Sequence, residues 1–261
     1  MLRTFSPEGI WPQDNEWGMH DYTREGAQGC TSFNEIIAKG YGEPQNAKEF
    51  AELAQWVNYD GHRSLFESRS QNRKGLLMWM SHSCWPSMVW QTYDYYFEPT
   101  AAYFAIKKAS EPLHIQWNPA TDEVEVVNYS AGTHKGLTAK VQVLNMDASV
   151  AWEKETTVDS NEDTTDKCIK LEFPENLSKV HFIKMTLTED GKVVSDNFYH
   201  RSLEENNYQD LRQLAKVALQ SATTVDKNAD GTWSAVSVIE NKTSTPALMI
   251  RFNVVGGKDD Q

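Results

Sequence analysis

The spacing of apolar residues changes near residue 112 of this 261-residue chain, and this change constrains the fold more than any other feature. Before that point, apolar residues recur every three or four positions, as they do along amphipathic helices. After it, segments such as 137–146 and 180–188 alternate apolar and polar residues, as half-buried strands do. We therefore expect an N-terminal α/β region followed by an all-β region.

The alternating segments of residues 112–203 are short and closely spaced, with a Glu-Asp-Gly turn signal at 189–191. Strands at this spacing predict an antiparallel sandwich of immunoglobulin type, although the Cys…Trp…Cys pattern of antibody domains is missing. Three further strand-like segments follow, at 216–225, 232–241 and 246–255. Because a sandwich needs roughly seven strands, we expect these three to begin a second sandwich that the chain does not complete.

The N-terminal region predicts helices and one buried strand. Capping-box signals at Ser32 and Asn46 open two helices, the second of which runs to about residue 71. The apolar run GLLMWM, residues 75–80, is typical of a buried strand, and another helix follows Pro99. This order of elements indicates part of a (β/α)8 barrel or of a doubly wound sheet. One strand cannot form a sheet alone, so the region is an incomplete α/β unit.

Tryptophan is concentrated in the N-terminal region. Seven of the nine tryptophans lie in the first 117 residues, and residues 78–98 are the most aromatic segment of the chain. Aromatic rings beside hydrogen-bonding groups suit sugars, whose apolar C–H faces stack on them. Trp79 ends the predicted strand, and in a barrel the loops after such strand ends form the active site. The competing interpretation is that these rings fill a core between the two regions, and it applies least to Trp79.

Charge and cysteine content exclude several classes of function. Lys and Arg number 25 and Asp and Glu number 37, so the formal charge is −12, and no basic block occurs. This balance argues against binding to nucleic acid or to an anionic membrane surface, whereas neutral sugars remain compatible. Cys30, Cys84 and Cys168 are too widely spaced for a disulfide framework or a zinc site, and we expect no metal or cofactor. We expect neither a transmembrane helix nor a signal peptide in this chain.

The segment WMSHSCWPSMVWQTYDYYFEPTAAYFAIKKASEPLHIQW, residues 79–117, resembles the end of the catalytic barrel in glycoside hydrolase family 2. The relatives most similar to it are exo-β-D-glucosaminidases, endo-β-mannosidases and β-mannosidases, whose pattern is W-x-L-N-x-x-W-P-S, x-D-Y-Y and Y-F-x-x-K-K-A-x-E-P-x-H-I-Q. The matching residues are Trp79, Trp85, Pro86, Ser87, Asp94, Tyr95, Tyr96, Tyr103, Phe104, Lys107, Lys108, Ala109, Glu111, Pro112, His114, Ile115 and Gln116. Ser81 and His82 stand where the family has Leu and Asn, so His82 bears on which sugar is selected.

Shorter matches extend the resemblance over most of the chain. Residues 33–44 and 55–68 resemble the stretch between the last two barrel strands, 195–199 the closing strand of the sandwich after the barrel, and 245–255 the start of the following sandwich. The resemblance implies that the chain begins inside one domain and ends inside another. We expect a C-terminal part of a TIM-barrel catalytic domain, an immunoglobulin-like β-sandwich and the start of a truncated second β-sandwich, at residues 1–111, 112–207 and 208–261.

The resemblance also implies the activity of a retaining, exo-acting β-glycosidase that hydrolyses β-linked glucosamine or mannose. Such enzymes use two carboxylates about 5–5.5 Å apart, and the resemblance places both upstream of residue 1, so we expect no catalytic residue here. None of the carboxylates near the N-terminus follows a buried strand: Glu8, Glu16, Glu25 and Glu35. We expect Trp79 to stack on the sugar in the −1 subsite, His82 to bond a sugar hydroxyl, and Trp85 to brace Trp79 or border an adjacent subsite.

Two other interpretations stay open. The chain can be a non-catalytic carbohydrate-binding or structural β-sandwich module, or it can complement a separate N-terminal piece of the barrel. The expected partners are an oligosaccharide or glycoside substrate in the intact parent and the missing N-terminal barrel portion, with no nucleic acid and no membrane. The compartment is not fixed by the sequence; relatives of this kind are often exported, so the resemblance points to a periplasmic or secreted parent.

Overall fold

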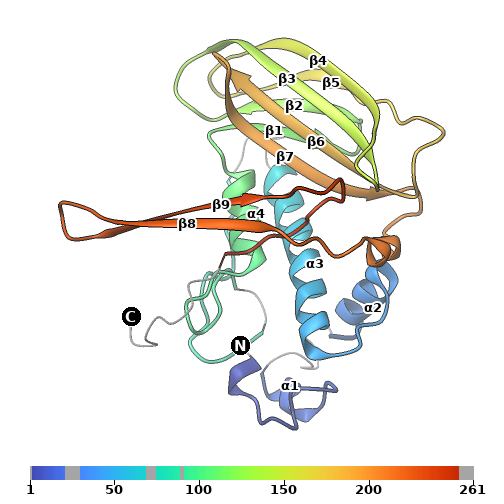
Figure 1. The fold of residues 1–261 in the computed structure, drawn as a ribbon, viewed down its shortest axis with the longest axis vertical. Coiled ribbons are helices and arrows are strands. Elements are labelled where there is room, and N and C mark those ends of the chain that lie inside the picture. The colour runs from blue at the N-terminus through green and yellow to red at the C-terminus, as the bar shows by residue number, and fades with distance from the viewer. Residues whose placement is uncertain (1, 21–29, 69–74, 89–90, 253–261) are drawn as a thin grey trace.

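The computed structural model of the protein describes residues 2–20, 30–68, 75–88 and 91–252. Figure 1 shows three parts in chain order: a helical part, two packed β-sheets and a long β-hairpin. The helical part contains η1 (Leu2–Thr4), α1 (Asn15–Met19), α2 (Cys30–Tyr41), α3 (Ala47–Ser68) and α4 (Ala101–Ala109). In the described ranges, none of these helices combines the length and the apolar character that crossing a membrane requires.

Helix α3 begins where the sequence predicts, because the residues before it bond its free N–H groups. Asn46 Oδ1 accepts a hydrogen bond from Glu49 N at 3.0 Å, and Glu49 Oε2 reaches back to Gln45 N at 2.8 Å. This is the reciprocal arrangement of a capping box, moved by one residue. Helix α2 instead begins at Cys30, so the prediction that Ser32 caps it is wrong: Ser32 lies inside the helix, where its backbone cannot adopt the extended cap conformation.

Trp17 organises the core of the helical part. Its ring is almost fully buried and packs edge-on against Phe5 and Phe50, while its indole N–H donates to Gly9 O at 3.1 Å. Ile37 of α2 and Phe50 of α3 close this cluster. Trp17 therefore anchors the first described segment, residues 2–20, to helix α3.

The predicted buried strand at residues 75–80 is wrong. These residues form no strand in the structure, and Trp79 is 78% exposed. A strand needs a neighbouring strand to take up its N–H and C=O groups, and every sheet among the described residues is built from strands that begin at Leu113 or later. Within the described residues, segment 75–80 therefore has no partner strand with which to form a sheet.

Seven strands between residues 113 and 202 form two antiparallel sheets, as the alternating pattern predicts (Figure 1). One sheet has the order β1-β2-β5 and the other β4-β3-β6-β7. The strands are β1 (Leu113–Asn118), β2 (Glu123–Asn128), β3 (His134–Asn145), β4 (Val150–Ser160), β5 (Thr164–Lys170), β6 (Val180–Glu189) and β7 (Lys192–Ser202). Their inward-facing aliphatic residues, such as Val126, Val141 and Met185, are fully buried between the sheets.

The turn between β6 and β7 confirms the Glu-Asp-Gly signal. Asp190 and Gly191 connect the strands, and both have positive φ, at 49° and 76°. Two-residue hairpins favour this backbone because its twist matches that of the flanking strands, and Asp-Gly adopts it at low cost. The turn pairs Glu189 with Lys192, and an irregularity between Leu187 and Thr188 then shifts the register by one residue, so that Ile183 pairs with Tyr199 in the middle of the sheet.

A buried polar cluster joins helix α3 to the sandwich. The Glu67 carboxylate, near the end of α3, accepts hydrogen bonds from Tyr199 Oη at 3.0 Å and Asn197 Nδ2 at 2.9 Å, both on β7. His114 on β1 lies 3.2 Å from the same carboxylate. One turn earlier, the Arg63 guanidinium bonds Asn197 Oδ1 and covers the Tyr199 ring at 4.0 Å. We call these five residues the junction cluster; it fixes how the helical part meets the sandwich.

The third part is a two-stranded hairpin that extends away from the body (Figure 1), made of β8 (Gln220–Lys227) and β9 (Trp233–Glu240). It confirms two of the three strands predicted after residue 208. The third, at 246–255, does not form within the described residues 246–252, and 253–255 lie outside them. Trp233 is 65% exposed on the hairpin, so neither strand contributes to a packed core here. A short 3-10 helix, η3 (Gln209–Gln213), connects the hairpin to the sandwich.

Candidate functional site

The aromatic segment, residues 75–100, is irregular but pinned by backbone hydrogen bonds. Ser81 O accepts from Thr92 N at 3.1 Å and from Tyr93 N at 2.9 Å, and Thr100 N donates to Thr92 O at 2.8 Å. These bonds bring the two ends of the segment together just before α4. The three side chains predicted to bind substrate, Trp79, His82 and Trp85, all lie on this segment.

Trp79 presents its indole to solvent. Its side chain is 78% exposed, and the peptide bond that follows it is cis. A large exposed aromatic surface is unusual for a residue flanked by apolar neighbours and marks a potential contact site. Within the described residues, Trp79 therefore does not fill a core.

His82 lies between the aromatic rings of the segment and its backbone. Its Nε2 is 3.2 Å from Tyr95 O, and its ring stacks on Phe97 with centroids 4.3 Å apart and planes 11° apart. Since a carbonyl oxygen only accepts, Nε2 is the donor, and in the neutral ring Nδ1 is then an acceptor. His82 thus has one nitrogen committed to the loop and one suited to a hydroxyl donor.

Trp85 is held by a stack of rings that the sequence did not predict. Its ring lies parallel to His20, with centroids 5.8 Å apart, and His20 stacks in turn on the buried Phe5 at 4.5 Å. His20 also bonds the residues after Trp85, through Nδ1 to Pro86 O at 2.6 Å and through its carbonyl to Met88 N at 3.1 Å. Trp85 keeps 42% of its surface exposed. Its ring partner in the described residues is His20, so the expectation that it braces Trp79 has no contact to support it.

Asp94 supports the loop that follows, as its position before α4 suggests. Its Oδ1 accepts hydrogen bonds from Tyr96 N at 2.8 Å and from Glu98 N at 3.0 Å. Glu98 in turn forms an ion pair with Arg251 at 2.7 Å, which ties the C-terminal segment to this loop. Asp94 therefore has a structural role in the described geometry.

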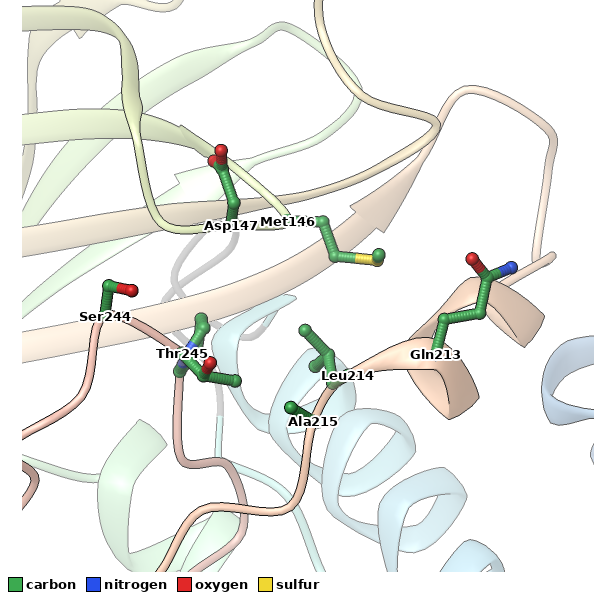
Figure 2. Close-up of a pocket in the computed structure, with 8 residues that line it drawn as sticks. Met146, Asp147, Gln213, Leu214, Ala215, Ser244 and Thr245 are labelled. Atoms are coloured by element: carbon green, nitrogen blue, oxygen red, sulfur yellow. The ribbon is translucent and has the colours of Figure 1, made fainter.

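A small pocket lies elsewhere in the molecule. Figure 2 shows side chains from three segments around it: the β3–β4 turn, the end of η3 with the two residues after it, and residues 244–246. Its volume is about 170 Å³, and its lining includes Met146, Asp147, Leu214 and Thr245. None of its lining residues belongs to the aromatic segment, so it is separate from the predicted binding residues. Within the described ranges, no cluster of three or more His, Cys, Asp or Glu side chains could hold a metal ion.

Comparison with known proteins places this geometry in context. The family model for the mannosidase Ig/CBM-like domain matches residues 122–202, which begin just before β2 and end with β7. The exo-β-D-glucosaminidase of Amycolatopsis orientalis is 28% identical over 98% of this chain. The crystal structure of the exo-chitosanase CsxA from the same organism matches 93% of this chain with a TM-score of 0.83 and 26% identity. This chain is homologous to family 2 glycoside hydrolases.

The homology covers most of this chain but a limited part of the relatives. The chain spans 28% of the length of the A. orientalis glucosaminidase and 32% of the CsxA chain. A mannosylglycoprotein endo-β-mannosidase of Lilium longiflorum is 27% identical over 82% of this chain and 23% of that enzyme. The expected resemblance to glucosaminidases and mannosidases of this family is thereby confirmed.

Family 2 homology directs attention to carboxylates, because glycoside hydrolysis needs a pair of them. Glu16 is bonded to Ser6, which donates from its backbone N at 2.6 Å and from its hydroxyl at 2.7 Å. The hydroxyl bond and then the backbone bond lower the pKa of Glu16, so it is an ionised brace for the first loop. Glu35 is exposed on α2, beyond the first turn, and so does not complete the capping box expected with Ser32. Glu25 lies outside the described residues. Glu8 is exposed in a loop.

Proposed function

We propose that this chain is part of a retaining, exo-acting β-glycosidase of family 2, and that Trp79, His82 and Trp85 form part of the wall around the sugar in its −1 subsite. In this proposal residues 1–111 are the C-terminal part of a TIM-barrel domain, 112–207 an immunoglobulin-like sandwich and 208–261 the start of a second sandwich. The catalytic carboxylates are supplied by polypeptide outside this chain.

The observation that carries the proposal is the exposure of Trp79. The chain around it is similar to an exo-β-D-glucosaminidase over 98% of its length. An exposed indole offers a flat apolar face to the C–H side of a sugar. Close to it in sequence, His82 offers a nitrogen that can accept from a hydroxyl. Together these groups would contact both the apolar C–H groups and the hydroxyl groups of a sugar.

The acidic charge of the chain favours glucosamine over mannose as the sugar. The formal charge is −12, and a field of that sign attracts cations. Glucosamine carries an amine that is protonated below neutral pH, whereas mannose is neutral. An ammonium group can also rest against an aromatic face through a cation–π interaction. We therefore expect glucosamine oligomers to bind more tightly than mannose oligomers, with an affinity that falls as salt is added.

In the intact parent the chemistry would be a double displacement. One carboxylate attacks the anomeric carbon while the other protonates the leaving oxygen, and water then releases the covalent glycosyl intermediate. The present chain would contribute binding and orientation of the sugar ring to this sequence. Because Glu16 braces a loop and Glu98 is ion-paired to Arg251, we expect no turnover from this chain alone.

Two measurements on the purified chain test the proposal. Ligand-observed NMR with glucosamine and mannose oligomers should detect binding that Trp79→Ala abolishes. Replacing Trp233, another largely exposed tryptophan on the hairpin, by alanine should leave this binding unchanged. Release of p-nitrophenol from its β-D-glucosaminide or β-D-mannoside should not exceed the rate in buffer. Turnover would contradict the assignment of catalysis to polypeptide outside this chain, and binding insensitive to Trp79→Ala would contradict the assigned wall.

A second candidate function is a non-catalytic carbohydrate-binding module. The match of residues 122–202 to an Ig/CBM-like family supports it, because that family description covers the sandwich rather than the aromatic segment. In this case the sugar would contact the sandwich surface, where Trp152 on β4 is partly exposed. Trp152→Ala would then abolish binding while Trp79→Ala would not, which is the reverse of the outcome expected above.

A further inference from the structure

Phe97 combines an exposed ring with an unusual backbone. Its side chain is 72% exposed, and its φ is +61°, in the left-handed region. Among the described residues, seven non-glycine residues have positive φ, and Phe97 is the one aromatic among them. A bulky residue avoids this region because its Cβ crowds the backbone, and residues held there tend to mark functional sites.

The surrounding loop holds Phe97 in this conformation from both sides. Phe97 N donates to Asp94 O at 3.0 Å, and Asp94 N donates to Glu98 O at 2.9 Å. The Asp94 carboxylate accepts from Glu98 N, and the Glu98 carboxylate pairs with Arg251. A glycine would satisfy the same backbone without strain, so the loop geometry alone gives no reason for a phenylalanine at this position.

The Phe97 ring continues the aromatic surface begun by the predicted binding residues. It stacks on His82 with planes 11° apart, and the Tyr95 ring lies 16° from the same His82 plane with centroids 6.4 Å apart. One face of Phe97 is therefore covered by His82, and its high exposure leaves the ring open to solvent. Trp79 lies three residues before His82, so their Cα atoms are at most about 11 Å apart.

We propose that Phe97, with Tyr95 beside it, forms a second sugar-stacking position, which receives the unit next to the sugar held at Trp79. The ligand class is then an oligosaccharide of at least two β-linked units rather than a monosaccharide glycoside. This inference rests on the proposed function, since it extends the same surface. It assigns to Phe97 a contact with ligand and to Asp94 the positioning of Phe97 through the loop.

The test compares glucosamine with its β-linked trimer, using ligand-observed NMR titrations of the 261-residue chain. Phe97→Gly removes the ring and also relieves the backbone, so loss of folding does not obscure the result. We expect Phe97→Gly to weaken trimer binding about two- to tenfold, the range for one aromatic stacking contact, and to leave monomer binding unchanged. Phe97→Tyr should bind the trimer as the wild type does, and Trp233→Ala serves as the control for an exposed ring elsewhere.

The outcomes separate the two proposals. Trp79→Ala should abolish binding of both monomer and trimer, because it removes the first position. If Phe97→Gly binds the trimer as tightly as the wild type, or weakens monomer and trimer equally, the second position is contradicted while the proposed function stands. If the wild type binds neither sugar, the proposed function and the second position are both contradicted.

Discussion

The junction cluster, where helix α3 meets the sandwich, and the aromatic segment before α4 use polar and aromatic groups in opposite ways. In the junction, Glu67 is buried and accepts hydrogen bonds from three surrounding side chains. In the aromatic segment, Trp79 and Phe97 are exposed, and the backbone beneath them is fixed by hydrogen bonds. Buried groups that are fully bonded hold a structure together, whereas exposed rings on a fixed backbone are free to bind a ligand. The difference separates groups that stabilise the fold from groups that are available to bind a ligand.

The largest effect on stability is expected when Glu67, the shared acceptor of the junction cluster, is removed. Glu67→Ala leaves Tyr199, Asn197 and His114 without their shared acceptor in a buried site. We expect a loss of about 3–5 kcal/mol in the free energy of unfolding, as when one partner of a buried charged group is deleted. Urea denaturation followed by circular dichroism measures it, with the exposed Glu175→Ala as control. A loss no larger than that of the control would mean that the junction contributes little to stability.

The second prediction concerns pH, through Glu111 at the edge of the junction. Burial alone would raise the pKa of Glu111, but hydrogen bonds from His114, Lys108 and Ser195 lower it to about 2. A carboxyl whose folded pKa is depressed stabilises the fold above its ordinary pKa of 4.5, and this stability is lost as pH falls toward 2. The difference in unfolding free energy between wild type and Glu111→Gln should therefore shrink from pH 5 to pH 3. A difference independent of pH would refute the assignment.

The pKa of His114 is shifted in the opposite direction to that of Glu111, so the two groups predict opposite changes of stability with pH. Burial alone would lower the pKa of His114, but hydrogen bonds to Glu111 and Glu67 raise it overall. Both ring nitrogens contact carboxylates, which requires the imidazolium form with two donors. Its contribution to stability is complete below the ordinary pKa of 6.5 and is lost as pH rises through the raised value. An NMR titration should give His114 a pKa above 6.5, and one below 6.5 would show that burial outweighs the two carboxylates.

Trp85 belongs to the aromatic segment, but its burial is intermediate between that of Glu67 and that of Trp79. It is half-exposed, and its ring stacks on His20. Trp85→Ala removes this aromatic contact, so we expect a loss of about 1 kcal/mol in unfolding free energy, within the range for one such pair. Thermal unfolding of Trp85→Ala and His20→Ala, with the double variant, measures whether the two losses overlap. Fully additive losses would indicate that the rings do not interact in solution.

The smallest effect on stability is expected at Trp79. Because its ring is exposed, Trp79→Ala should change the unfolding free energy by no more than about 0.5 kcal/mol. The same variant is expected to abolish sugar binding. A loss of stability comparable to that of Glu67→Ala would show that Trp79 packs against the protein, and it would remove the contrast between the two regions.

Local patterns predicted the elements of this fold but not how distant elements meet. The period of two located β2 to β6, the Asp-Gly turn set the β6–β7 hairpin, and Asn46 with Glu49 set the start of α3. The strand at 75–80 failed because an apolar run reports burial in a sheet only when partner strands exist, and none lies in the described residues. The junction escaped prediction because Glu67 and Tyr199 are 132 positions apart.

In the candidate site, too, local features could be predicted from the sequence, whereas contacts between distant segments could not. An aromatic-rich segment is visible in the sequence, but Asp94, whose place before a helix suggests a cap, accepts hydrogen bonds from Tyr96 N and Glu98 N in the preceding loop, and Thr100 is the N-cap of α4. The stack of His20 on Trp85 joins segments 65 positions apart, and nothing in either segment signals it. The left-handed backbone conformation of Phe97 could not be predicted from the sequence either, because Gly, Asn and Asp are the residues that usually adopt this conformation.

The most direct test of the central claim, that the aromatic segment is a sugar-binding surface, uses the nine tryptophans as probes. Each indole N–H gives its own cross-peak in a ¹H–¹⁵N spectrum of the labelled chain. Titration with the β-linked glucosamine trimer should shift the cross-peaks of Trp79 and Trp85 in a saturable way and leave those of Trp152 and Trp233 in place. Shifts confined to Trp152 would favour the sandwich as the binding surface, and no shift at Trp79 or Trp85 would contradict the claim.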